Sequence, residues 1–147
     1  MRAVVQRVTA ADVKIDGEVR GKINSGFMIL LGVGEGDTDA DLKYIADKVI
    51  NLRIFSDENG KMNLSLSDIG GEMLVISQFT LYGDCSHGRR PYFGDAMNPA
   101  DAERMYEEFV EYVRMAGIHV ETGEFGADMK VTLTNDGPVT IILDSRK

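Results

Sequence analysis

Residues 73–82 read Met-Leu-Val-Ile-Ser-Gln-Phe-Thr-Leu-Tyr, and this stretch decides how the rest of the chain is arranged. Its first four residues are all apolar, which is typical of a strand that is buried on both faces. Ser77, Gln78 and Thr80 then bring in hydrogen-bonding groups that are costly to bury without partners. We therefore expect a central strand from Met73 to Leu81, whose end either emerges into solvent or lines a pocket with polar groups.

Further strand signals lie on both sides of this central strand. Residues 2–9 alternate loosely between apolar and polar side chains and are rich in Val. Val13–Ile15 and Val19–Ile23 flank Asp16-Gly17, which predicts a hairpin because Gly tolerates the positive φ of a two-residue turn. The remaining signals predict a buried strand at residues 26–33, a hairpin around 57–60, and strands at 118–122, 129–134 and 139–143.

Two segments have the spacing of amphipathic helices. The first opens with Thr38 and Asp41, a pair that resembles a capping box. The second opens with Asn98-Pro99, a polar cap followed by proline at the first helical position, and Gly117 closes it. The expected inner faces are Leu42, Ile45, Ala46, Val49 and Ile50 in the first helix, and Ala102, Met105, Tyr106, Phe109, Val113 and Ala116 in the second.

Together these elements predict an α+β fold: a single domain over residues 1–147 with two main helices and a mostly antiparallel sheet, curled towards a barrel. Strands and helices do not alternate regularly, which excludes a doubly wound fold. No apolar run approaches the roughly 20 residues of a membrane span, and the charged N-terminus does not resemble a signal peptide. With Cys85 as the only cysteine, we expect a cytoplasmic protein.

The net charge of −8 argues against broad, charge-driven binding to nucleic acid, so we expect no DNA partner. It still allows a small site that holds only the end of an RNA. Positive charge is available locally, at Arg2, Arg7, Arg89, Arg90, Arg146 and Lys147.

Conventional catalytic motifs are weak in this sequence. Cys85, Ser86 and His87 are direct neighbours, and neighbours rarely have the geometry of a nucleophile with its base. No Gly-x-Ser-x-Gly elbow occurs. The chain has only two histidines and one cysteine, so we expect no metal site and no cofactor. A Cys or Ser hydrolase centred on residues 85–87 remains an alternative.

Residues 134–140, Thr-Asn-Asp-Gly-Pro-Val-Thr, form the second notable segment. Its residue types are those of a hairpin turn, and Pro138 at the start of the last strand removes one backbone donor from the sheet. Sequence alone does not fix the isomer of the Gly137–Pro138 bond, because only about 5–6% of such bonds in folded proteins are cis.

Taken together, Ser77–Thr80 and Asn135–Thr140 resemble the D-aminoacyl-tRNA deacylases. The resemblance extends over essentially the whole chain. It includes Met1–Val8, Ser77–Leu81, Gly88–Pro91, Phe125–Met129 and Asn135–Thr140.

This resemblance implies a hydrolase that removes D-amino acids, and glycine, from the 3′ end of tRNA, acting as a homodimer with its site near the interface. Ser77, Gln78, Phe79 and Thr80 would line the pocket for the aminoacyl group and the terminal adenosine, with Met129 contributing to the adenosine site. Gly137 and Pro138 would carry a Gly–cis-Pro pair that reaches into the partner's pocket and excludes an L side chain.

An aminoacyl ester is already reactive, so its hydrolysis needs positioning and a place for negative charge more than a strong base. Backbone N–H groups of Gln78 to Thr80 are candidates for that place, with the ribose 2′-OH assisting the attacking water. Two alternatives remain open: Thr80 as a nucleophile, and a module that binds the 3′ end of RNA without catalysis.

Overall fold

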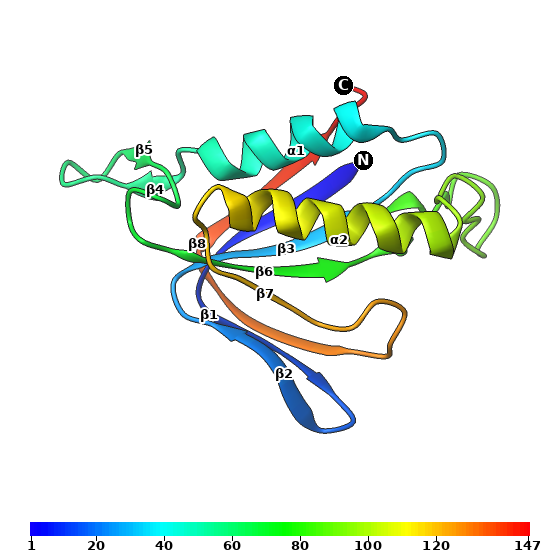
Figure 1. Ribbon diagram of the computed structural model, residues 1–147, viewed down its shortest axis with the longest axis horizontal. Helices are drawn as coiled ribbons and strands as arrows, with labels where there is room; N and C mark the ends of the chain where they lie inside the picture. Colours follow the sequence, from blue (N-terminus) through cyan, green and yellow to red (C-terminus); the bar gives the residue numbers. More distant parts are fainter.

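The computed structural model describes residues 1–147, with two helices on one side of a curved sheet (Figure 1). The strands are β1 (Arg2–Ile15), β2 (Glu18–Ile23), β3 (Gly26–Gly32), β4 (Phe55–Ser56), β5 (Met62–Leu64), β6 (Glu72–Ser77), β7 (Val120–Thr122) and β8 (Lys130–Asp144). The helices are α1 (Asp39–Asn51), α2 (Pro99–Met115) and a short 3₁₀ helix, η1 (Phe79–Tyr82).

The main sheet has the order β2-β1-β3-β6-β7, and β8 also pairs with β1. The pairings of β1 with β2, β3 and β8 are antiparallel, whereas β3–β6 and β6–β7 are parallel. β4 and β5 form the separate hairpin expected around residues 57–60. The predicted α+β class with a mostly antiparallel, curled sheet is therefore confirmed.

The sheet is apolar on both faces, as the continuous runs in β3 and β6 predicted. One face carries the main core, in which both helices pack against residues such as Phe27, Ile29 and Val75. The other face has a smaller core of Val8, Ala11, Val13, Ile23, Met28, Leu74 and Ile76, covered by β8 residues such as Val131. The second core exists because β1, β2 and β8 curl over the far side of the sheet.

Both helix starts were predicted correctly. The Thr38 N–H donates to the Asp41 carboxylate (2.8 Å), and Asn98 caps α2 by accepting from the Asp101 N–H (3.1 Å). Ala116 was wrongly placed on the inner face of the second helix, because α2 ends at Met115 and Ala116 is exposed. The Tyr106 hydroxyl donates to the Val75 carbonyl (2.6 Å), which fixes α2 against β6.

Three strand predictions were wrong at their boundaries. The segments 2–9 and 13–15 are parts of one strand, β1, because β8 pairs along nearly all of it. The segments 129–134 and 139–143 likewise belong to the single strand β8, and no hairpin turn separates them. The central strand ends at Ser77 instead of Leu81, and the chain then coils into η1.

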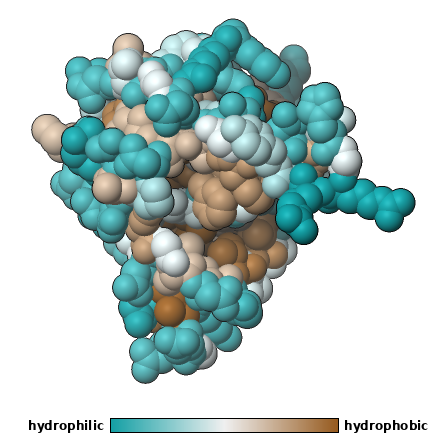
Figure 2. Space-filling view, turned by 90° about the vertical axis from the view of Figure 1, so that its right-hand side faces the viewer, coloured by the Kyte–Doolittle hydropathy of each residue, from teal (hydrophilic) through white to brown (hydrophobic).

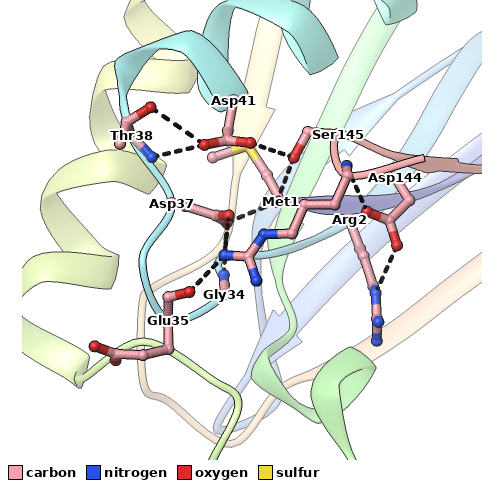
Figure 3. A network of polar contacts seen from close by, with 10 residues as sticks. Met1, Arg2, Gly34, Glu35, Asp37, Thr38, Asp41, Asp144 and Ser145 are labelled. Atoms are coloured by element: carbon pink, nitrogen blue, oxygen red, sulfur yellow. Dashed lines mark hydrogen bonds and ion pairs between the residues drawn. The ribbon is translucent and has the colours of Figure 1, made fainter.

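A polar network joins the start of β1, the end of β8 and the loop between β3 and α1 (Figure 3). The Met1 amine lies 2.7 Å from an Asp37 carboxylate oxygen, and both groups are fully buried. That oxygen also accepts from the Gly34 N–H (2.7 Å), while the other oxygen accepts from Arg146 (2.9 Å). The glycine-rich segment 32–36 is thus a turn held by Asp37. No helix is long and apolar enough to cross a membrane.

Candidate functional site

The main pocket of the molecule lies where β6 ends, and its volume is about 560 Å³. Its walls come from the end of β6 and η1, the start of α2, and the segment that leads from β7 into β8. The lining residues are Val33, Ile76, Ser77, Gln78, Phe79, Phe93, Ala96, Met97, Asn98, Pro99, Ala102, Phe125, Gly126, Ala127, Met129 and Val131. The corresponding face of the protein has hydrophobic surface at its centre and hydrophilic residues around it (Figure 2).

The start of η1, beside the pocket, has backbone N–H groups that lack a partner within the helix. The Gln78 N–H donates to the Leu31 carbonyl (2.8 Å), which continues the pairing with β3. The first donor within η1 is the Leu81 N–H, which bonds to the Gln78 carbonyl (3.3 Å). The N–H groups of Phe79 and Thr80 therefore have no partner within the 3₁₀ helix, as expected for the first turn of any helix. They are the backbone donors that η1 offers beside the pocket.

The opposite end of η1 is held from β1. Arg2 donates to the Leu81 carbonyl (3.0 Å) and to the Asp144 carboxylate (3.0 Å), and its guanidinium lies 4.5 Å from the centre of the Tyr82 ring. Burial raises the pKa of the Tyr82 hydroxyl, and the nearby Asp37 carboxylate raises it further. For Asp144, burial favours a higher pKa, but hydrogen bonds from the Arg146 N–H and from Arg2 bring it below the ordinary value.

The side chains of the turn are exposed towards the mouth of the pocket. Phe79 is 56% exposed and meets Phe93 edge to face, with 5.2 Å between the ring centres. The Gln78 amide donates to the Thr80 hydroxyl. An exposed aromatic pair at a pocket mouth offers apolar surface to an incoming ligand.

Residues 135–140 contain a bulge that interrupts the pairing of β8 with β1. In the pairing with β1, Gln6 lies opposite Thr140 and Val8 opposite Asn135, so residues 136–139 bulge out beside Arg7. Asn135 closes the bulge, because its side chain accepts from the Val139 N–H (2.7 Å) and donates to the Val139 carbonyl (3.1 Å). The tip is the exposed Gly137–Pro138 pair, and its peptide bond is cis.

Arg7 supports this bulge from β1. Its guanidinium donates to the Asp136 carbonyl (2.9 Å) and to the Ile54 carbonyl (2.6 Å). Gly137 has φ +141°, and a Cβ at this position would come within 2.9 Å of the Val139 nitrogen. The bulge is therefore held from both sides in a conformation that needs glycine.

The structure brings some of the expected site residues together and leaves others apart. Ser77, Gln78, Phe79 and Met129 all line the pocket. Thr80 lies next to it on η1, whereas Gly137 and Pro138 are absent from the lining. One copy of the chain therefore contains the pocket and the Gly–Pro bulge as separate features.

Sequence reasoning missed several pocket walls. Phe93, Met97 and Ala102 come from the loop before α2 and from α2 itself, and only the tertiary structure brings them to β6. Phe125 and Ala127 belong to the segment Phe125–Met129, which carries part of the family resemblance, but only its Met129 was expected to line the site. The one available signal in the sequence was an aromatic residue, Phe93, close to the polar stretch of residues 83–90.

The alternative centred on residues 85–87 gains no support from the geometry. Cys85 and His87 are exposed, and no hydrogen bond connects them. The Ser86 N–H donates to the Asp84 carboxylate (2.9 Å), and hydrogen bonds from Ser86 lower the pKa of that carboxyl. These contacts shape a loop and create no activated nucleophile.

Comparison with known proteins identifies the family. The D-Tyr-tRNA(Tyr) deacylase family model matches residues 4–144. The D-aminoacyl-tRNA deacylase of Thermosipho africanus (strain TCF52B) is 59% identical over 147 residues, and that of Clostridium botulinum (strain Alaska E43 / Type E3) is 63% identical; each match covers 100% of this chain and 99% of the relative.

Two solved structures share the fold. A protein described as c-Myc DNA unwinding element binding protein is 42% identical, with a TM-score of 0.92 and coverage of 98% of both chains. A probable eukaryotic D-amino acid tRNA deacylase is 18% identical, with a TM-score of 0.81 and coverage of 97% of both chains. The match to the family model and the closely similar full-length relatives lead to one conclusion: this chain belongs to the D-Tyr-tRNA(Tyr) deacylase family.

Proposed function

We propose that this protein hydrolyses the ester bond between a D-amino acid, or glycine, and the terminal ribose of tRNA. The observation that carries the proposal is the pocket at the end of β6, whose wall includes the first turn of η1 with the N–H groups of Phe79 and Thr80 free of helical partners. Membership of the deacylase family supports the same reaction.

In this mechanism, water attacks the ester carbonyl carbon, and negative charge develops on the carbonyl oxygen. Backbone donors fixed before the reaction stabilise such charge without reorganising, which makes them suited to this step. The C–O bond to the ribose then breaks, releasing the free amino acid and a tRNA with a 3′-hydroxyl. The ribose 2′-OH assists the water, so no side-chain base is needed. We expected the Gln78 N–H among these donors, but it already donates to the Leu31 carbonyl. The N–H groups of Phe79 and Thr80 are therefore the donors available to the carbonyl oxygen.

Selection between enantiomers is assigned to the Gly137–Pro138 bulge. Its tip is exposed and lies outside the pocket of its own chain, which fits a role in the pocket of a second copy. We therefore propose a cytoplasmic homodimer in which the bulge of each protomer closes the pocket of its partner. Rigid backbone there rejects an L side chain by steric clash and leaves room for hydrogen or a D side chain.

The direct test is deacylation of D-Tyr-tRNA and L-Tyr-tRNA by the purified protein, with the spontaneous rate of each subtracted. We expect rapid release of D-Tyr and no release of L-Tyr above background. Equal hydrolysis of both would contradict the chiral selection. Binding without hydrolysis would favour the alternative of a non-catalytic module for the 3′ end of RNA.

The dimeric site is tested by complementation between two variants, each of which is impaired in activity or selectivity on its own. One variant is altered in the bulge (Gly137→Ala), and the other has its pocket filled (Ala127→Trp). If the site is shared, a mixed dimer pairs the intact pocket of the first variant with the intact bulge of the second, and activity returns. If pocket and bulge of the same chain cooperate, mixing the variants restores nothing.

One relative is described as a DNA-binding protein, so DNA is included as a competitor. The net charge of −8 disfavours the broad phosphate contacts of duplex binding. We expect duplex DNA to leave deacylation of D-Tyr-tRNA unchanged at concentrations at which uncharged tRNA competes.

A further inference from the structure

Residues 83–93 form a loop that follows η1 and carries two arginines; we call it the basic loop. It leaves η1 at Gly83, whose N–H donates to the Thr80 carbonyl (3.0 Å), and it returns at Phe93. Asp84 and Tyr92 exchange two backbone hydrogen bonds (2.8 and 2.9 Å), which close the base of the loop. Phe93 lines the pocket, and the other end of the loop continues from η1, whose first residue, Phe79, lines the pocket as well.

Arg89 and Arg90 lie on this loop, and both are exposed. Neither makes a hydrogen bond, an ion pair or a cation–π contact. Every other arginine has a polar partner: Arg2 and Asp144, Arg7 and Asp136, Arg20 and Glu124, Arg53 and Asn63, Arg104 and Asp101, Arg114 and Glu111, and Arg146 and Asp37. The guanidinium groups left free by the fold are thus the two on this loop.

The charge of this loop contrasts with that of the whole protein. The chain carries a net charge of −8, which repels a polyanion at most of its surface. The nearest carboxylates along the sequence belong to Asp84 and Asp95. The Asp84 carboxylate already accepts a hydrogen bond from the Ser86 N–H, and Asp95 follows the base of the loop. Two adjacent free arginines therefore give a local attraction for phosphate at one place.

We propose that Arg89 and Arg90 bind phosphodiester groups of the single-stranded 3′ end of the tRNA, next to the terminal adenosine. This inference rests on the proposed function, in which that adenosine and its aminoacyl group occupy the pocket. The adjoining nucleotides then leave through the mouth, within reach of a loop whose arginines are three and four residues from Phe93. The planar guanidinium suits phosphate because it donates two parallel hydrogen bonds.

Such contacts make a specific kinetic signature. They are made equally in the ground state and the transition state, so they lower KM and leave kcat unchanged. Each phosphate contact to a single strand adds about 0.7 to the slope of log affinity against log salt. Two contacts add about 1.4, which means that raising salt fourfold weakens wild-type binding about sevenfold more than binding by a variant without them.

The experiment compares the wild type with the double variant Arg89→Ala/Arg90→Ala. The control variant is Lys22→Ala/Lys61→Ala, which removes the same charge from exposed lysines on β2 and on the β4–β5 hairpin; neither lysine lines the pocket. Four quantities are measured between 50 and 200 mM salt: kcat and KM on D-Tyr-tRNA, the affinity for uncharged tRNA, and the rate on D-Tyr esterified to adenosine, a substrate without phosphates.

For the arginine variant we expect a KM at least several-fold higher at 50 mM salt, a smaller salt slope and an unchanged kcat, with the adenosine ester hydrolysed at the wild-type rate. The lysine variant should match the wild type throughout. An unchanged KM and salt slope in the arginine variant would overturn the inference, as would an equal loss on the adenosine ester. If the wild type hydrolysed neither substrate, the proposed function would fail, while the affinity for uncharged tRNA would still decide the role of the arginines.

Discussion

Replacing Asp37 by Asn tests the buried polar network at the junction of the two chain ends. The change keeps the size of the side chain and removes its negative charge. In the folded protein one carboxylate oxygen lies 2.7 Å from the Met1 amine and accepts from the Gly34 N–H, and the other accepts from Arg146. Asn offers only one acceptor oxygen, so its NH₂ group must face at least one of these donors.

The expected magnitude follows from burial. The Met1 amine and the Asp37 side chain are both fully buried, so the amine would be left without its counter-ion in a site that water does not reach. Removing one partner of a buried ion pair costs about 3–5 kcal/mol of folding free energy. For a chain of this length, about 2–4 °C of melting temperature is lost per kcal/mol, which gives a decrease of about 6–20 °C.

The assay is urea unfolding followed by circular dichroism, with midpoint and slope fitted separately, together with a thermal melt at pH 7. The matched control is Asp128→Asn, because the Asp128 side chain is 91% exposed and pairs only with Lys130; we expect a change below about 1 kcal/mol there. A loss of less than about 1 kcal/mol in Asp37→Asn, at unchanged slope, would refute the argument that this pair holds the chain ends together.

Three further outcomes follow from the site. Gly137→Ala should lower kcat/KM for D-Tyr-tRNA by more than tenfold or admit L-Tyr-tRNA, because its Cβ would lie 2.7 Å from a Val139 methyl at φ +141°; activity and selectivity like the wild type would contradict this. Thr80→Ala keeps the backbone N–H and should retain kcat within about fivefold; loss of turnover with retained binding would instead support Thr80 as the nucleophile. Asp144 has a folded pKa below its unfolded value of about 3.8, so its contribution is present above that pH and is lost as the pH falls through the folded pKa. Unfolding free energies of the wild type and Asp144→Asn should therefore differ most near pH 7 and converge as the pH falls from about 3.8 through the folded pKa; a constant difference would show that the ion pair with Arg2 is irrelevant.

The local chemistry of the sequence predicted most of the elements. The Asn98-Pro99 start of α2, the Asp16-Gly17 hairpin and the buried strand β3 each depend on residues within a few positions of one another. Helix caps, turn residues and apolar periodicity act over that range, so a single sequence contains their signal. The polar residues after Ile76 were recognised in the same way as a possible pocket wall.

The errors lie where distant residues decide the local structure. The stretch from Gln78 to Leu81 was expected to continue a strand, but it coils into η1, whose far end is held by Arg2 from β1. The segment Asn135–Thr140 looked like a hairpin turn, yet it is a bulge in a continuous strand because β1 pairs with β8 on both sides of it. No local pattern records these pairings.

The sequence by itself determined the α+β class, the positions of both helices and, through family resemblance, the two segments that matter for function. Only the tertiary structure decided that Ser77 to Phe79 share a pocket with Phe93, Met97 and Ala102. The physical reason is that a pocket is the space left between elements from separate parts of the chain. Its walls are set by long-range packing, whereas propensity and periodicity describe each element alone.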